Sequence, residues 1–358
     1  MIRKDKQEIG PALNNSLLVD DIRQMIEATR SAVASTINAG LTTLYWNIGK
    51  RIREEILKGE RGEYGQEIIA SLGQELAKDF GKGFEEKNLR HMIRFAETFP
   101  DEQIVYALRR QLSWTHFRLL IYLDDPIKRE FYAEMCRIER WSTRTLQERI
   151  NSMLYERTAI SRKPEEVILH ELATLREQNL LTPELVFRDP YVLDFLGLKD
   201  RYLEKDLEDA ILRELEAFLL ELGAGFAFVA RQRRIQIDDD DFYIDLLFYH
   251  RSLHRLIAID LKLGNFKAEY KGQMELYLRW LDKHERQPGE ESPLGIILCA
   301  GKKQEQIELL ELNRSGIHVA EYLTELPPRE LLAERLHRAI KTARARLETY
   351  DTNTGVDK

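Results

Sequence analysis

Two apolar segments in the second half of the chain each carry charged residues at their centre. Asp245 lies within residues 243–247 (YIDLL), and Asp260 and Lys262 lie within residues 258–262 (AIDLK). Residues two apart along a strand point to the same face of a sheet, so Asp260 and Lys262 should lie side by side. If the two segments form antiparallel neighbours joined by a short turn, Asp245 lies beside Asp260.

Two carboxylates and a lysine on one sheet face suit the hydrolysis of phosphodiester bonds. Neighbouring buried carboxylates repel each other and raise each other's pKa unless a cation lies between them. Carboxylate oxygens bind Mg²⁺ or Mn²⁺, and the bound ion polarises a phosphate and activates a water molecule. The lysine can orient that water or stabilise charge that develops on the phosphate.

The alternative interpretation is an ordinary strand with one wet face, on which Asp260 and Lys262 form a lateral ion pair. That interpretation fits most isolated Asp-x-Lys patterns. Here the charges interrupt two strongly apolar strands, which favours the catalytic interpretation.

The periodicity of the second half predicts the elements that would position these residues. We expect helices at 204–222, 267–285, 303–312 and 327–347, and strands at 226–237, 242–250, 254–264, 294–300 and 316–322. The central order is α-β-β-β-α-β, so this half should be an α/β domain with a mixed sheet.

The first half has helical spacing, and nothing before residue 160 alternates like a strand. The expected helices lie at 17–57, 64–80, 85–98, 103–124 and, as a pair, within 126–157. We therefore expect an all-helical domain at 1–160, a linker at 161–185 with a short helix near 164–178, an α/β domain at 186–348 and a tail at 349–358.

Composition limits the class of protein. With 358 residues, 43% of them hydrophobic and 32% charged, the chain has room for two domains and is typical of folded proteins. No run of 18 apolar residues predicts a membrane span, and the N-terminus lacks a secretion signal. Cys136 and Cys299 lie in apolar segments, which predicts reduced thiols and a cytoplasmic location. The net charge of −7 gives no simple nucleic-acid signature, but a local basic face remains compatible with it.

The second half resembles the PD-(D/E)XK nuclease superfamily. The motif of that superfamily is an Asp on the second strand, here Asp245, and [DE]-x-K on the third, here Asp260 to Lys262. Many members add Gln-x-x-x-Tyr on the next helix, here Gln273 to Tyr277. Longer runs resemble the YhcG-type proteins, among them LYWNIGKRI, GFEEKNLRHMIRFAETFP and HRLIAIDLKLGNFKAEYKGQMELYL. This resemblance covers nearly the whole chain.

The sequence departs from the superfamily pattern at two positions. Ile244 stands where the motif has proline, a common variation. Asp260 stands where glutamate is more usual, and its shorter reach could shift the metal preference.

The resemblance implies a restriction-endonuclease-like fold and a Mg²⁺- or Mn²⁺-dependent deoxyribonuclease. Asp245 and Asp260 would bind the metal, Lys262 would act on the water or the phosphate, and Gln273 would support them. Many members add a glutamate from the first core helix. Glu214, Glu216 and Glu221 are the candidates considered, and Glu221 is the one chosen as a third metal ligand.

Several basic residues are candidates for DNA contact. Arg231 and Arg233 lie on the first strand, where they could bind phosphates or guard an exposed edge. Lys267 and Lys271 lie on the helix that carries Gln273, where backbone contact and a solvated face are equally good explanations. Lys87, Arg90 and Arg94 share a helix face in the first half, which suits a DNA-reading helix or an ordinary helical hairpin.

Two other functions fit the sequence less well. One is a nucleic-acid binding protein that does not cleave, against which the intact Asp, Asp and Lys set argues. The other is a scaffold that oligomerises through its helical half. A homo-oligomer is compatible with the nuclease interpretation too, because cutting two opposed strands needs two sites.

Overall fold

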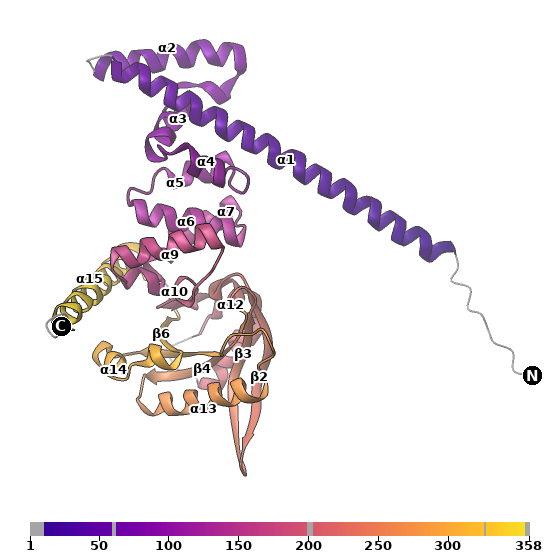
Figure 1. Ribbon diagram of the computed structural model, residues 1–358, viewed down its shortest axis with the longest axis vertical. Coiled ribbons are helices and arrows are strands. Elements are labelled where there is room, and N and C mark those ends of the chain that lie inside the picture. Colours follow the sequence, from indigo (N-terminus) through magenta and orange to yellow (C-terminus); the bar gives the residue numbers. More distant parts are fainter. Residues whose placement is uncertain (1–10, 59–61, 199–202, 326, 355–358) are drawn as a thin grey trace, which may run out of the picture. The chain divides into compact units, whose positions relative to one another are not determined.

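The structure is a computed structural model that describes residues 11–58, 62–198, 203–325 and 327–354. Its contacts divide the chain into two compact units, Met1–Gln147 and Glu148–Lys358 (Figure 1). We call them the helical unit and the α/β unit and describe each by itself. No described helix is both long and apolar enough to span a membrane.

Among its described residues, the helical unit has helices joined by turns and loops and has no strand, as the sequence predicts. They are α1 (Pro11–Lys58), α2 (Gly62–Phe80), η1 (Lys82–Phe84), α3 (Glu86–Thr98), α4 (Glu102–Leu108), α5 (Trp114–Leu120), α6 (Pro126–Glu139) and the start of α7 (Thr143–Asn151). The single helix predicted at 103–124 is wrong. The chain begins a new helix after Ser113, whose backbone N–H donates to Nδ1 of His116 at 3.1 Å.

Close packing of α1 on α3 holds the helical unit together. A Cβ atom on Gly49 would lie 1.9 Å from the backbone oxygen of Met92, so only glycine allows this approach. Beside it, the indole Nε1 of Trp46 donates to the carbonyl of Phe99 at 2.8 Å. The Phe95 and Phe117 rings are 4.6 Å apart at their centroids. One end of α1 is therefore fixed in a buried aromatic core.

The α/β unit is built on a six-stranded mixed sheet with the strand order β1-β6-β5-β4-β3-β2. The strands are β1 (Tyr191–Val192), β2 (Phe226–Ile237), β3 (Asp240–His250), β4 (Arg255–Asn265), β5 (Leu294–Gly301) and β6 (Ile317–Leu323). β2, β3 and β4 are antiparallel neighbours, whereas β4, β5, β6 and β1 run parallel. The predicted mixed sheet is confirmed.

The helices of the α/β unit are α8 (Leu154–Arg157), η2 (Ala159–Arg162), α9 (Glu165–Gln178), α10 (Pro183–Val186), η3 (Asp194–Leu196), α11 (Glu204–Arg213), α12 (Leu215–Leu222), α13 (Glu269–His284), α14 (Gln304–Leu309), η4 (Leu312–Ser315) and α15 (Arg329–Thr354). The helix predicted at 204–222 is thus two helices, divided at Glu214. Residues 126–157, predicted as a pair of helices, hold three: α6, α7 and α8.

Helix α13 covers one face of the sheet through apolar contacts. Met274, Leu278 and Leu281 are buried in the same hydrophobic cluster as Ile297 of β5. Gly295 allows this contact, because a Cβ atom there would lie 2.6 Å from the Met274 side chain. The central strands are apolar on both faces because helices flank them.

The observed division of the chain differs from the predicted boundaries. The two units meet between Gln147 and Glu148, not at residue 160. Within residues 161–185 the short helix expected near 164–178 is present as α9, and α10 follows it; Ile168, Leu172 and Leu175 are buried, so this segment packs as part of the α/β unit. Helix α15 runs on to Thr354 through much of the predicted tail, and residues 355–358 lie outside the described residues.

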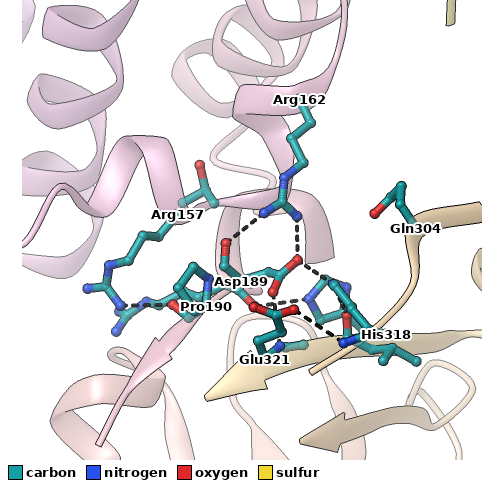
Figure 2. A network of polar contacts seen from close by, with 12 residues as sticks. Arg157, Arg162, Asp189, Pro190, Gln304, His318 and Glu321 are labelled. Carbon is teal, nitrogen blue, oxygen red and sulfur yellow. Dashed lines mark hydrogen bonds and ion pairs between the residues drawn. The ribbon is translucent and has the colours of Figure 1, made fainter. Parts of the chain in front are cut away.

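A buried aspartate, Asp189, links the segment before β1 to β6 and to the end of β5 (Figure 2). Oδ2 of Asp189 accepts from Nη1 of Arg162 at 2.7 Å and forms an ion pair with Lys302, which follows β5. Its Oδ1 accepts the backbone N–H of Glu321 in β6 at 3.0 Å. Burial opposes ionisation, but Lys302 and Arg162 hold the pKa of Asp189 well below its usual range. The charged carboxylate is therefore part of the folded structure.

We expect Asp189→Asn to lower the stability of the α/β unit by about 3 kcal/mol at neutral pH, because two cations lose their buried partner. A depressed folded-state pKa stabilises the fold above the unfolded value of about 4 and loses that contribution at lower pH. The difference between the two proteins should shrink as the pH falls below about 4. Urea unfolding across pH measures it. Asp194→Asn, at an exposed position, is the matched control, and equal stability of all three proteins would contradict this role.

Candidate active site

The pairing of β3 with β4 brings the two predicted aspartates together. The antiparallel ladder ends at the pair Leu246 and Ile259, so the next residues along are Asp245 and Asp260. At that point Oδ2 of Asp245 accepts the backbone N–H of Leu261 at 2.8 Å. The side chain of Asp245 thus bridges the strands where their backbone ladder stops.

Asp260 is a buried carboxyl group beside two charges. It is 2% exposed, and its Oδ2 lies 3.0 Å from Nζ of Lys262. Burial and the neighbouring Asp245 carboxylate raise the pKa of Asp260 to about 7, although Lys262 opposes the shift. Burial disfavours the ammonium group of Lys262, but Asp260, Asp245 and Glu204 raise its pKa above the usual value. The three predicted residues therefore form one coupled group.

A third carboxylate, from α11, joins this group. The side-chain amide of Gln232 donates to Oε2 of Glu208 at 2.8 Å and to Oδ1 of Asp245 at 3.0 Å. The flanking pairs in the β2–β3 ladder place Gln232 opposite Asp245. Burial raises the pKa of Glu208, and its buried Oε1 has no hydrogen-bond partner. Nε of Arg231 is the nearby cation, 3.6 Å from that oxygen.

Sequence reasoning missed Glu208 and the hydrogen bond that Gln232 donates to Asp245. A signal for Glu208 was present, because it lies one helical turn from Ile211 and next to Leu207, both buried. A charged residue on the apolar face of the first core helix is more informative than the glutamates nearer its end. The contact of Gln232 with Asp245 depends on the strand register, which the local sequence pattern does not give.

Glu221, the predicted third metal ligand, is engaged elsewhere. Its Oε1 is paired with Arg157 and accepts the backbone N–H of Val192 at 2.9 Å. Its Oε2 lies 3.1 Å from Nη1 of Arg188. Arg157 and Arg188 also hold the pKa of Glu221 below its usual value against the cost of burial. The structure does not bring Glu221 to Asp245 and Asp260, which argues against the predicted metal-binding role.

Gln273 and its partner Tyr277 lie near the carboxylates. The side-chain amide of Gln273 donates to the Tyr277 hydroxyl one helical turn on. Burial raises the pKa of Tyr277, and the charges of Asp260 and Asp245 act in the same direction. Gln273 is thus linked to the acidic group through Tyr277, and its supporting role stays a prediction.

The four cations predicted to contact DNA differ in how exposed they are and in how firmly other groups of the protein hold them. Arg231 and Arg233 lie on the edge strand β2, half-exposed, and pair with Glu208 and Asp209 and with Glu285, respectively. Lys267 is exposed, with Glu269 at 3.5 Å. Lys271 is held more firmly, because its Nζ donates to the carbonyl of Leu310 at 2.9 Å. DNA contact by these residues stays a prediction.

The basic residues of α3 are partly used within the helical unit. Arg90 pairs with Glu86 one turn earlier at 2.7 Å. Nε of Arg94 donates to the carbonyl of Ile121 at 2.8 Å, and its guanidinium lies over the ring of Tyr122. These contacts fit a helical hairpin, and the alternative of DNA contact through Lys87, Arg90 and Arg94 stays a prediction.

The acidic group fits a divalent metal with oxygen ligands. Within the described ranges, no three or more His, Cys, Asp or Glu side chains are gathered as a metal cage. Mg²⁺ does not need one, since it binds through one or two carboxylates and completes its shell with water and substrate phosphate. The raised pKa of Asp260 and the Oε1 of Glu208, which accepts no hydrogen bond, are the donor chemistry that such an ion would suit. Asp245 and Asp260 would hold the ion.

Two family models match consecutive parts of the chain. The model for the YhcG PDDEXK nuclease domain matches residues 184–337, and the model for the DUF1016 N-terminal domain matches residues 21–157. The first covers the whole acidic group, and the second lies almost entirely within the helical unit.

Solved endonuclease structures align with only part of the chain. A repair endonuclease from Pyrococcus abyssi is 20% identical with a TM-score of 0.25, and the alignment covers 36% of this chain and 50% of that one. A complex of EndoMS with double-stranded DNA is 15% identical with a TM-score of 0.27, over 36% of this chain and 49% of that one. The alignments thus span about half the length of those proteins.

A curated relative matches along nearly its whole length. The protein described as "Putative nuclease YhcG" from Escherichia coli (strain K12) is 35% identical. The alignment covers 89% of this chain and 92% of that protein. Because this identity extends through both units, and each unit matches its own domain model, the chain belongs to the YhcG family of proteins with a PD-(D/E)XK nuclease domain.

Proposed function

We propose that this protein hydrolyses phosphodiester bonds of DNA in a reaction that depends on Mg²⁺ or Mn²⁺. The observation that carries the proposal is the burial of Asp260 beside Asp245, with Lys262 at 3.0 Å. Buried carboxyl groups with a strongly shifted pKa beside other charges are concentrated at the active sites of proteins. Membership of a nuclease-domain family supports the same reaction class.

In this proposal, Asp245 and Asp260 hold the ion between β3 and β4. The bound ion would polarise the scissile phosphate and lower the pKa of a water molecule. Asp245 cannot swing away, because Leu261 and Gln232 each donate a hydrogen bond to it. Fixed carboxylates lower the cost of reorganisation when the substrate binds.

Lys262 acts as a cation rather than as a base. Its raised pKa keeps the ammonium protonated at neutral pH, so it cannot accept a proton from water. Its Nζ can turn from Asp260 to a phosphate oxygen and stabilise the charge that develops there. The unpartnered Oε1 of Glu208 can accept a hydrogen bond from the attacking water, and Gln232 fixes the other oxygen of Glu208.

DNA would reach the site across the edge of the sheet. Arg231 and Arg233 on β2 and the exposed Lys267 are cations on the surface of the same unit, and they are the proposed phosphate contacts. Lys271 has a smaller part, because its ammonium already binds a backbone carbonyl.

The first prediction from this proposed function concerns the group of Asp245, Asp260 and Lys262. With Mg²⁺ or Mn²⁺, the wild-type protein should cleave at least one of plasmid, linear or branched DNA. Asp245→Asn, Asp260→Asn and Lys262→Ala should each lower the rate by a factor of about 100 or more, because each removes a charge that acts on the transition state. Gel assays of product against time measure the rates.

Asp239→Asn and Lys283→Ala, both at exposed positions, are the matched controls and should cleave like the wild type. Wild-type protein that binds DNA tightly and never cuts it would refute the nuclease and favour a non-cleaving binding protein. Activity that survives all three site variants would place the reaction elsewhere.

The second prediction separates Glu208 from Glu221. Glu208→Gln should retain the fold, yet need more Mg²⁺ and cleave about 10 to 100 times more slowly, the usual cost of losing a group beside metal ligands. Glu221→Gln should instead lower stability by about 3 kcal/mol, because Arg157 and Arg188 lose a buried partner, and leave the Mg²⁺ requirement unchanged.

Rates across a Mg²⁺ titration, with urea unfolding of the same samples, test this contrast. Asp209→Asn serves as the control, since Asp209 is a partly exposed neighbour of Glu208 on α11. If the effects of Glu208→Gln and Glu221→Gln were exchanged, Glu221 would be the metal ligand after all.

The third prediction is a link between pH and metal. Without metal the pKa of Asp260 is about 7, and a divalent ion binds only the ionised carboxylate. At low Mg²⁺ the rate should fall about tenfold per pH unit below that pKa, because the ionised fraction falls by the same factor. Saturating Mg²⁺ should shift the midpoint to lower pH. A midpoint that stays fixed as Mg²⁺ rises would show that the titrating group does not bind the metal.

A further inference from the structure

Helix α1 carries an apolar stripe that the helical unit leaves uncovered. Its side chains are 40–66% exposed, and they are Leu18, Val19, Ile22, Met25, Ile26, Val33, Ile37, Leu41 and Leu44. At 3.6 residues per turn these positions fall within about half of the helix circumference. We call this set the α1 stripe.

The opposite side of α1 is the one that packs within the unit. Thr42 and Trp46 are buried, and Gly49 touches the backbone of α3. At 100° per residue these three lie on the far side of the helix from the α1 stripe. The stripe therefore faces away from the core that anchors α1.

The C-terminal half of the α1 stripe lies in a segment without charged residues. Residues 31–49 contain no Asp, Glu, Lys or Arg. Thr29 and Thr36 lie along the stripe, but each hydroxyl donates to a carbonyl of its own helix, at 2.8 Å to Met25 and 2.9 Å to Ala32. Arg23 and Arg30 lie at one edge of the N-terminal half of the stripe, where long exposed side chains can keep their guanidinium groups in water.

The area of the stripe matches a stable protein interface. Nine large side chains that are about half-exposed offer roughly 900 Å² of apolar surface, close to the ~800 Å² that each partner buries in a standard interface. A monomer seldom exposes a continuous apolar patch of that size. The surface is therefore large enough to hold a partner without further contacts.

We propose that the α1 stripe is the contact between two copies of this chain, which pair through α1. A second copy brings an equally apolar and equally long stripe, so the surface is complementary to itself. A charged partner would have to lose its hydration against the stripe without gaining an ion pair there. Pairing would join two α/β units in one particle, and it does not depend on whether those units cleave DNA.

The test compares the mass of the full chain in solution with that of two matched variants. Ile26→Glu/Val33→Glu places two charges seven residues apart at the centre of the stripe. Gln24→Glu/Ser31→Glu places two charges seven residues apart on the exposed opposite side. Glutamate is a good helix former, so both variants should keep α1 helical. Sedimentation equilibrium at tens of micromolar gives the masses, and tryptophan fluorescence, to which buried Trp46 contributes, reports folding.

We expect the wild type and the opposite-side variant to sediment as two chains of 42.1 kDa each, and the stripe variant to sediment as one chain with native fluorescence. A wild type that sediments as a single chain would overturn the proposal. So would a stripe variant that still sediments as two chains. If the fluorescence of the stripe variant changes, Ile22→Glu alone, farther from Trp46, must separate the chains for the proposal to stand.

Discussion

The candidate active site depends on the point at which the β3–β4 ladder ends. Beyond the Leu246–Ile259 pair the strands no longer exchange backbone hydrogen bonds, and the Asp245 carboxylate takes the N–H of Leu261 instead. That single contact fixes one carboxylate beside another that is almost fully buried.

The surrounding side chains keep the neighbouring carboxylates together although these repel each other. Gln232 links Asp245 to Glu208, so β2 and α11 position the acidic group together with β3 and β4. Lys262 offsets part of the negative charge, yet the pKa of Asp260 still rises to about 7. The metal-free fold therefore carries unfavourable charge at its site, and the ion pairs of Asp189 and Glu221 stabilise the same sheet elsewhere.

Different physical forces dominate in the two units. In the α/β unit, buried charges are distributed over several strands and helices, and most of them have partners. In the helical unit, α1 buries one end through Trp46 and Gly49 and leaves a long apolar face exposed. Electrostatics therefore underlies the metal and DNA binding proposed for the α/β unit, and the hydrophobic effect underlies the pairing proposed for the helical unit.

The sequence by itself determined the mixed sheet, the position of its strands and the group of Asp245, Asp260 and Lys262, because alternation and burial are local properties of the chain. It could not separate the candidate glutamates: Glu221 and Glu208 lie on adjoining helices, and only the tertiary structure shows that Arg157 and Arg188 pair with Glu221. The break at Glu214 and the contact of Gln232 with Asp245 also depend on distant packing or on strand register. Local pattern predicts which face of an element is buried, whereas the identity of a buried charge's partner is decided by segments far away in the chain.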